Sequence, residues 1–213
     1  VLNVWSNSFS ELYSPLHDAN FDKEFKEFVR IELDNLDYET TEPVMNSPIT
    51  EEEVCKVVGK AKLNKAMGID MLPYEVFKND RSKELLVELF NMIFSTGLVP
   101  TVWLKCVIKP LPKSSTVDPR IPLQYRGISL LSTVGKLYTG IINIRLLGYL
   151  EDNKLLVEEQ NGFRPGRSCL EHIFTLSTIV QTRKAQNLDT FTTFIDFENA
   201  FDKVDRELLI FKL

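Results

Sequence analysis

The sequence TFTTFIDFENAFDKV, residues Thr190–Val204, carries the most information about fold and chemistry. Its first residues alternate in a way that predicts a β-strand over 190–196, with Asp196 at the strand end. Phe201 follows five residues later. A strand-end carboxylate followed by an aromatic residue suits metal-dependent nucleotidyl transfer. Because a two-metal site needs further carboxylates and only a helix start follows Asp202, we expect the front part of a catalytic domain that is inactive alone.

The composition predicts an ordinary globular protein. Its 213 residues, 44% hydrophobic and 26% charged, suffice for one large or two small domains. The three cysteines lack C-x-x-C spacing and there are only two histidines, so neither a structural zinc site nor a disulfide framework is expected. No stretch predicts a membrane span, and the start of the sequence does not resemble a signal peptide. An intracellular setting is therefore expected, with nucleus and cytoplasm not distinguished.

Charge is distributed unevenly along the sequence. Residues 1–60 carry 5 basic and 13 acidic side chains, whereas residues 101–170 carry 10 basic and 5 acidic. The net charge of −5 is therefore an average over unlike regions. A basic middle is compatible with phosphate binding, although a solvated basic face would produce the same count.

Upstream of the quoted stretch the pattern is mainly helical. Thr50 and Glu53 form a capping box that opens a helix ending near residue 62, and a loop follows over 64–73. A second amphipathic helix is predicted over 82–94, ending at Gly97.

The rest of the sequence predicts an extended segment and three more helices. Residues 102–112 read as extended, and a long helix is predicted over 129–150. A capping box at Ser168-Cys-Leu-Glu171 opens a helix to about residue 184, and Asp205 is predicted to cap a last helix from Arg206.

Four sequence blocks, in this order, resemble the reverse transcriptases of non-LTR (LINE-type) retrotransposons. The blocks are KAMGIDMLP (65–73), YRGISLLS through Lys136 (125–136), EQNGFRPGRS (159–168) and FIDFENAFDKVD (194–205). Two residues depart from the usual pattern, because Met71 stands where glycine is usual and Gly127 where proline is commonest. A bacterial or intron-encoded reverse transcriptase shares the general plan, but QNGFR and AFD favour the LINE type.

The resemblance implies an α+β fold, mostly helical with few strands. It would comprise the fingers and a partial palm of a right-hand polymerase, truncated before the second catalytic palm motif. The expected division is an acidic linker or N-terminal extension at 1–48, fingers with the first palm helices at 49–188, and the start of the palm at 189–213.

The resemblance also assigns roles around the quoted stretch. Asp196 matches the first metal-binding, catalytic aspartate, and the backbone carbonyl of Phe197 is an additional ligand for Mg²⁺ in the intact enzyme. Phe201 matches the aromatic residue that lies under the sugar of the incoming nucleotide and excludes a 2′-hydroxyl. The structural alternatives are a turn-capping role for Asp196 and a core position for Phe201; Asp202 is left outside the catalytic set.

Basic residues upstream of the quoted stretch match phosphate contacts; Lys113 ends the segment KPLPK (109–113), and the others lie in the second and third blocks. By resemblance, Lys113 and Arg126 hold the triphosphate of the incoming nucleotide, for which the planar arginine fork is well suited. Gly162, Arg164 and Arg167 form a basic turn before a helix and are predicted to approach template or primer. The alternatives are a solvated loop lysine at 113 and pairing of the two loop arginines with Glu158 and Glu159.

The predicted function is a fragment of an RNA-directed DNA polymerase. Its expected partners are an RNA template, a DNA primer and deoxynucleoside triphosphates; no membrane is expected, and protein partners are unknown. One alternative is a non-catalytic nucleic-acid-binding remnant, which the basic middle of the chain would suit. Another is a protein-interaction fragment that uses the acidic first 60 residues.

Overall fold

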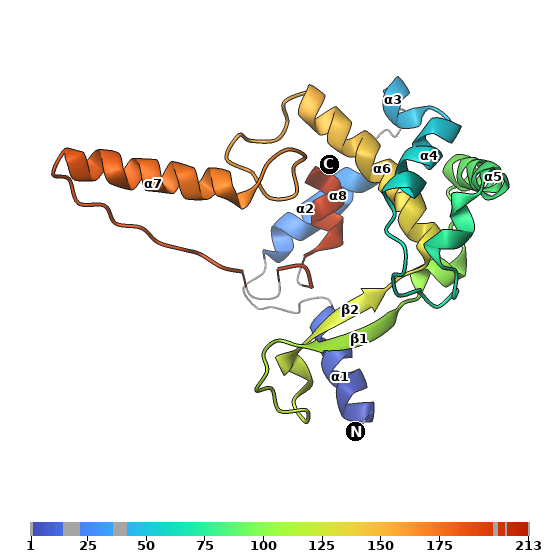
Figure 1. Ribbon diagram of the computed structural model, residues 1–213, viewed down its shortest axis with the longest axis horizontal. Coiled ribbons are helices and arrows are strands. Elements are labelled where there is room, and N and C mark those ends of the chain that lie inside the picture. Colours follow the sequence, from blue (N-terminus) through green and yellow to red (C-terminus); the bar gives the residue numbers. More distant parts are fainter. Residues whose placement is uncertain (1, 15–21, 36–41, 198–199, 203, 213) are drawn as a thin grey trace.

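The computed structural model describes residues 2–14, 22–35, 42–197, 200–202 and 204–212. Within these residues it contains helices and one antiparallel strand pair, which confirms the predicted mixed, mostly helical class (Figure 1). The α-helices are α1 (Leu2–Tyr13), α2 (Lys23–Asp34), α3 (Pro43–Asn46), α4 (Glu51–Lys60), α5 (Asp80–Thr96), α6 (Thr133–Asp152), α7 (Cys169–Ala185) and α8 (Arg206–Lys212). Short 3₁₀ helices span Tyr74–Lys78, Thr101–Leu104 and Pro122–Gln124, and the strands are β1 (Val107–Pro112) and β2 (Tyr125–Leu130).

The hydrophobic core lies where α4, α5 and α6 meet. The capping box predicted at Thr50 and Glu53 is present, and Val54 and Val58 on the helix that it opens are 0% and 1% exposed. The second predicted helix is α5, which ends at Gly97 with φ +68°, a left-handed conformation that glycine adopts without steric cost. Both helix predictions for this region are therefore confirmed.

A buried arginine ties the core to the segment that precedes it. Arg145 of α6, with a side chain 5% exposed, pairs with both carboxylate oxygens of Glu53 at 2.6 and 2.8 Å. It also donates to the carbonyl oxygens of Ser47 and Pro48 at 2.7 and 3.0 Å. The arginine therefore satisfies otherwise unpaired backbone groups and fixes the entry of α4. It also helps to hold the pKa of Glu53 down at about 2.

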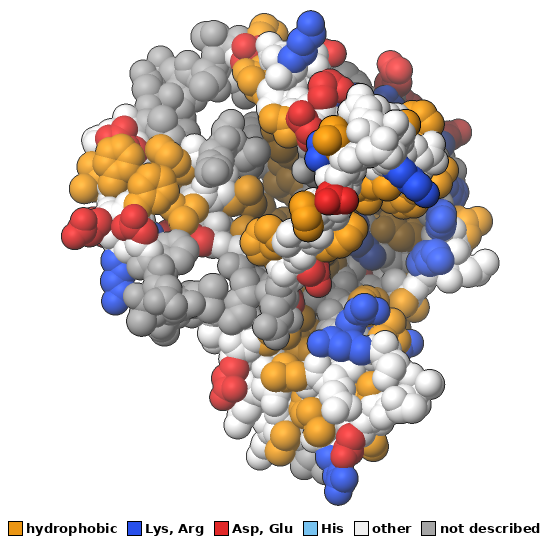
Figure 2. Space-filling view, turned by 90° about the vertical axis from the view of Figure 1, so that its left-hand side faces the viewer, with side chains coloured by type: hydrophobic (Ala, Val, Ile, Leu, Met, Phe, Trp, Pro, Cys, Tyr) orange, Lys and Arg blue, Asp and Glu red, His pale blue; other side chains and the backbone are white. Residues whose placement is uncertain are grey.

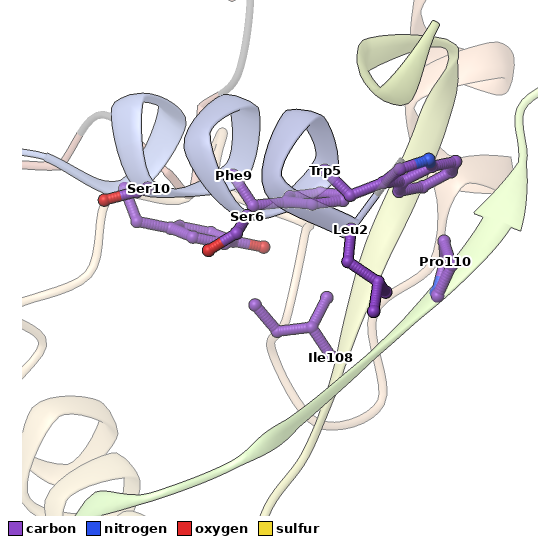
Figure 3. Close-up of a pocket in the computed structure, with 8 residues that line it drawn as sticks. Leu2, Trp5, Ser6, Phe9, Ser10, Ile108 and Pro110 are labelled. Atoms are coloured by element: carbon purple, nitrogen blue, oxygen red, sulfur yellow. The ribbon is translucent and has the colours of Figure 1, made fainter. Parts of the chain in front are cut away.

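The strands β1 and β2 form a hairpin with an exact register, in which Ile108 faces Ser129 and Pro110 faces Gly127. Helix α1 covers one face of this hairpin (Figure 3). The ring centroids of Trp5 and Tyr125 lie 5.0 Å apart. A pocket of about 660 Å³ remains between α1 and β1. A β-carbon at Gly127 would lie 2.7 Å from Tyr13 Oη and 2.8 Å from Phe9 Cε1. The glycine at this position therefore permits the close approach of α1.

The hairpin corrects one helix boundary. The predicted helix over 129–150 begins only at Thr133, because Ser129 and Leu130 belong to β2 and pair with Ile108 and Val107. Ser132 then caps α6, and its Oγ accepts a hydrogen bond from the amide of Gly135 at 3.2 Å.

Helix α8 lies against α2, far from it in sequence (Figure 1). Asp205 caps α8 as predicted, because its Oδ1 accepts hydrogen bonds from the amides of Glu207 and Leu208. The same carboxylate pairs with Lys26 of α2 at 2.5 Å. Glu207 pairs with Arg30 at 3.2 Å and with Lys26 at 3.5 Å, so several ion pairs join the helices.

Helix α7 projects away from the rest of the described molecule, and an extended segment returns from it towards α8 (Figure 1). Its predicted capping box between Ser168 and Glu171 is present. The predicted strand over 190–196 is wrong, because residues 190–197 form no ladder with any described segment. A strand requires a neighbour to accept and donate its backbone hydrogen bonds, which local alternation cannot supply.

Among the residues that the structure describes, no helix is both long and apolar enough to cross a membrane.

Candidate functional site

The hairpin brings the two predicted triphosphate contacts to one face. Side chains alternate across a sheet, and residues directly opposite one another point to the same side. The face away from α1 therefore carries Leu111 and its opposite residue Arg126. Lys113 follows β1 on the same alternation, and its amide continues the ladder with a 3.0 Å hydrogen bond to the carbonyl of Gln124. Lys113 and Arg126 thus lie on the open face of the hairpin.

This open face is cationic. The sequences of β1 and β2, VIKPLP and YRGISL, contain no carboxylate. Within the described residues no side-chain hydrogen bond or ion pair involves Lys113 or Arg126, and both side chains are exposed. The carboxylate of nearby Asp118 is instead paired with Arg120 at 2.7 Å. The two cations are therefore available to an anionic ligand.

The first two sequence blocks, residues 65–73 and 125–136, contact each other beside the hairpin. Ser132 Oγ donates a hydrogen bond to Asp70 Oδ2 at 2.5 Å, and Ser132 is 1% exposed. The backbone at Gly68 lies so close that a β-carbon there would be 2.3 Å from the carbonyl oxygen of Leu131. Asp70 therefore holds the Lys65–Pro73 loop against the start of α6.

One departure from the family pattern coincides with an unusual backbone. Met71, where glycine is usual, has φ +54°, and its side chain is 66% exposed. A residue with a β-carbon pays about 1–2 kcal/mol in the left-handed region. The loop therefore keeps the conformation that glycine would adopt, at a steric cost.

In the predicted nucleic-acid loop, the two arginines have different environments. Arg164 is buried, with a side chain 6% exposed that pairs with both Glu151 oxygens at 2.9 and 2.7 Å and donates to the carbonyl of Val157 at 2.8 Å. The hydrogen bond from Arg164 lowers the pKa of Glu151. Arg167 is more exposed and pairs with Glu158 at 2.5 Å. Pairing with Glu158, an alternative that the sequence left open, is thus present for Arg167.

The third and fourth blocks meet through two exposed aromatic rings. Phe163 and Phe201 lie edge to face with centroids 6.1 Å apart, although they are 86% and 78% exposed. Phe163 has φ +65°, a strained conformation for a residue with a side chain. Gly162, next to it, has only the side chain of Gln160 within 4 Å of a β-carbon position. The sequence did not predict the ring contact, because the two residues lie in separate blocks.

Asp196 and Phe197 are exposed, on the extended segment that follows α7. Across the described ranges, no three His, Cys, Asp or Glu side chains gather in a group that could hold a metal ion. The described residues therefore supply one candidate carboxylate at Asp196 and do not by themselves form a two-metal site, which needs several carboxylates. Glu198 and Asn199 of the same block lie outside the described residues.

Comparison with known proteins finds a family match for about half of the chain and several similar proteins. Residues 111–213 match the family described as "Reverse transcriptase (RNA-dependent DNA polymerase)". The "Probable RNA-directed DNA polymerase from transposon BS" of Drosophila melanogaster is 29% identical over 183 residues, which make up 85% of this chain and 20% of that protein. The "RNA-directed DNA polymerase from mobile element jockey" of the same species is 27% identical over 168 residues, covering 78% of this chain and 18% of that protein.

A third relative is the "Transposon TX1 uncharacterized 149 kDa protein" of Xenopus laevis, which is 28% identical over 168 residues, 78% of this chain and 12% of that protein. The chain thus spans at most about a fifth of the length of these curated relatives. These similarities confirm the resemblance carried by the four blocks: the chain is similar to the RNA-directed DNA polymerases of non-LTR retrotransposons, and the match to the reverse transcriptase family covers residues 111–213.

Proposed function

We propose that this chain forms the fingers and the start of the palm of an RNA-directed DNA polymerase, with an N-terminal extension at 1–48, the fingers and first palm helices over 49–188, and the start of the palm at 189–213. The intact enzyme would extend a DNA primer on an RNA template with deoxynucleoside triphosphates. The observation that carries this proposal is the shared open face of Lys113 and Arg126 on the hairpin.

That face suits the triphosphate of an incoming nucleotide. The guanidinium of Arg126 can hold two phosphate oxygens at once and stays charged, whereas Lys113 acts as a point charge. Because neither side chain is paired with a described carboxylate, binding an anion requires no existing ion pair to break.

The palm residues have complementary proposed roles. Asp196 would bind metal, with the carbonyl of Phe197 as a further ligand, and Mg²⁺ is the ion we expect; it would stabilise charge on the reacting phosphates. Since the described residues do not complete that site, the remaining ligands must come from elsewhere in the intact enzyme. Phe201, supported by Phe163, would stand under the sugar and reject a 2′-hydroxyl by overlap.

The loop before α7 would approach template or primer through Gly162 and Arg167. Arg167 would exchange its exposed partner Glu158 for a phosphate, since a charge pair open to solvent contributes little stability. The buried Arg164 would hold the loop in place through its ion pair with Glu151. A direct contact of Arg164 with template or primer would be secondary.

Primer extension on an RNA template with Mg²⁺ tests the proposal. The 213-residue chain is compared with a version extended through the downstream reading frame, and we expect activity only in the longer protein. In that protein, Asp196→Asn should abolish extension and leave template binding intact, while Asp189→Asn, the same change at the start of the segment, should have little effect.

Two results would count against polymerase function. Equal loss of binding and extension in an Asp196→Asn variant that is misfolded by circular dichroism would assign Asp196 to the fold; the same equal loss in a folded variant would reject a role confined to catalysis. Inactivity of a folded longer protein would favour the alternative, a non-catalytic nucleic-acid-binding remnant.

A further inference from the structure

A third cation stands in line with the two proposed triphosphate contacts. Lys109 lies opposite Ile128 in the hairpin register, so it points to the same face as Arg126 and away from α1. Along the hairpin from its loop end, the order is Lys113, then Arg126 opposite Leu111, then Lys109. Each step is two residues, or about 6–7 Å at the usual rise of a strand. The open face therefore carries an evenly spaced row of positive charge.

Lys109 is free to bind a ligand. Its side chain is exposed, and within the described ranges no hydrogen bond or ion pair engages it. Its neighbours on this face are exposed apolar side chains, with Val107 47%, Leu111 44% and Ile128 41% exposed. Cations interleaved with apolar surface suit a nucleic-acid strand, whose phosphates meet the charges while sugars and bases lie on the apolar surface.

The opposite face of the hairpin cannot serve this purpose. It is lined by Ile108, Pro110 and the aromatic residues of α1, including Trp5 and Phe9 (Figure 3). None of the described residues that line the pocket between them is basic. A polyanion reaching the hairpin strands is therefore directed to the open face.

We propose that Lys109 binds a backbone phosphate of the nucleic-acid strand that lies beside the incoming nucleotide. The inference rests on the proposed function, in which Lys113 and Arg126 hold the triphosphate. Since Lys109 lies on the far side of Arg126 from Lys113, it extends the row beyond the triphosphate subsite. A strand carries one charge per roughly 3.4 Å of helix axis, so steps of 6–7 Å let neighbouring cations hold different phosphates.

Salt-dependent binding to the 213-residue chain tests the proposal. The probe is a fluorescein-labelled DNA primer annealed to an RNA template with a 5′ overhang, followed by anisotropy between 50 and 200 mM salt. The slope of log K against log salt is negative, and each lost phosphate contact decreases its magnitude by about 0.7–0.9. We expect that decrease for Lys109→Gln, the wild-type slope for Lys109→Arg, and no change for Lys56→Gln, an exposed lysine on α4.

Further probes identify the strand and separate this proposal from the proposed function. A decrease seen with the overhang probe and single-stranded RNA, but not with a blunt duplex, assigns the phosphate to the template; a decrease with the blunt duplex assigns it to the paired region. Binding of a labelled deoxynucleoside triphosphate should fall for Arg126→Gln and stay unchanged for Lys109→Gln.

Three outcomes overturn the inference. An unchanged slope for Lys109→Gln rejects it while leaving the triphosphate site intact. Weaker triphosphate binding in Lys109→Gln, with the nucleic-acid slope unchanged, assigns Lys109 to the nucleotide instead. If the wild-type chain shows no salt-dependent binding to any of the nucleic-acid probes, the inference fails together with the proposed nucleic-acid contacts.

Discussion

Helices α4 and α7 begin with the same capping motif but differ in how far their apolar side chains are buried. Each opens with a capping box, Thr50 with Glu53 and Ser168 with Glu171, and each carries an apolar stripe. On α4 the stripe is buried, with Val54 and Val58 0% and 1% exposed, whereas Ile173 and Phe174 on α7 are 62% and 74% exposed. Figure 2 looks from the side towards which α7 projects and shows hydrophobic side chains exposed there. Capping thus determines where a helix begins, and only a packing partner buries its face.

The difference lies in what each helix packs against. Helix α4 lies between α5 and α6 and is held by Arg145 across 92 residues of sequence. For α7, no residue among those described is buried. The following changes test whether the two helices differ in stability as they do in packing.

The largest effect is expected from Arg145→Ala. Removing it leaves Glu53 and the carbonyls of Ser47 and Pro48 without their buried partner, which typically costs about 3–5 kcal/mol. Urea unfolding should show this loss, and hydrogen exchange should show faster exchange in α4 with α7 unchanged. Arg81→Ala, which breaks an exposed pair with Glu84, is the control and should cost less than about 1 kcal/mol. A similarly small cost for Arg145→Ala would show that α4 is held by its valines alone.

Acid should loosen α4 through the same pair. The pKa of Glu53 is about 2 in the folded protein against an ordinary 4.5, so its carboxylate stabilises the fold above pH 4.5. That contribution should be lost as the pH falls from about 4.5 towards 2. Urea unfolding at steps of pH should show the loss in the wild type and a smaller one in Glu53→Gln; equal pH dependence would place the responsible carboxylate elsewhere.

A smaller loss is expected from Gly68→Ala, because the added β-carbon would meet the backbone of Leu131 at 2.3 Å. Overpacking of this kind costs about 1–3 kcal/mol. The matched change Gly59→Ala on α4 has open space and replaces a poor helix former, so it should stabilise by up to about 1 kcal/mol. Thermal unfolding of both variants compares them, and a neutral Gly68→Ala would mean that the Lys65–Pro73 loop is not docked on α6.

Met71→Gly should be mildly stabilising. It relieves the left-handed strain at φ +54° but adds freedom to the unfolded chain, for a net gain of up to about 1 kcal/mol. Met92→Gly, at an exposed position inside α5, should instead cost about 1 kcal/mol. Chemical denaturation distinguishes the two signs; a loss at Met71 would indicate that its side chain packs in solution.

The smallest effect is expected on α7. Phe174→Ser removes an exposed ring, so the free energy of unfolding should change by less than about 0.5 kcal/mol while solubility rises. Val58→Ala on α4, which creates a cavity, should cost 1 kcal/mol or more. If Phe174→Ser costs as much as Val58→Ala, α7 is packed in solution and the contrast between the helices disappears.

Local features of the fold could be predicted from sequence. The boxes at Thr50 and Ser168, the stop at Gly97 and the cap at Asp205 all depend on residues a few positions apart. The start of α6 differs from the prediction because Leu130 also fits the apolar pattern of a helix, whereas the pairing of Ser129 and Leu130 with β1 depends on residues more than twenty positions away. The strand over 190–196 was wrong because pairing depends on a distant neighbour.

The residues around the candidate site also fall into two groups, those that the sequence suggests and those whose partners only the fold shows. Lys113 and Arg126 are candidates that the sequence itself offers, Arg126 in its block and Lys113 at the end of KPLPK (109–113), and strand alternation would also have pointed to Lys109. Arg145 and Arg164 look like any other basic residues in the sequence, and only the fold shows that their partners are Glu53 and Glu151. The ring contact of Phe163 with Phe201 likewise depends on how separate blocks meet.

The ion pairs between α2 and α8 join a segment near the start of the chain to one near its end. Lys26 and Asp205 are 179 residues apart, and the entropic cost of closing a loop rises only as the logarithm of its length, so a few charge pairs can act at this range. Their side chains are partly exposed, which makes the closure sensitive to salt. Phe28 of α2 also lies edge to face with Phe211 of α8, with ring centroids 6.5 Å apart. A cut in the exposed segment between α7 and Asp196 would therefore leave α8 as a separate peptide whose attachment to α2 weakens as the ionic strength rises.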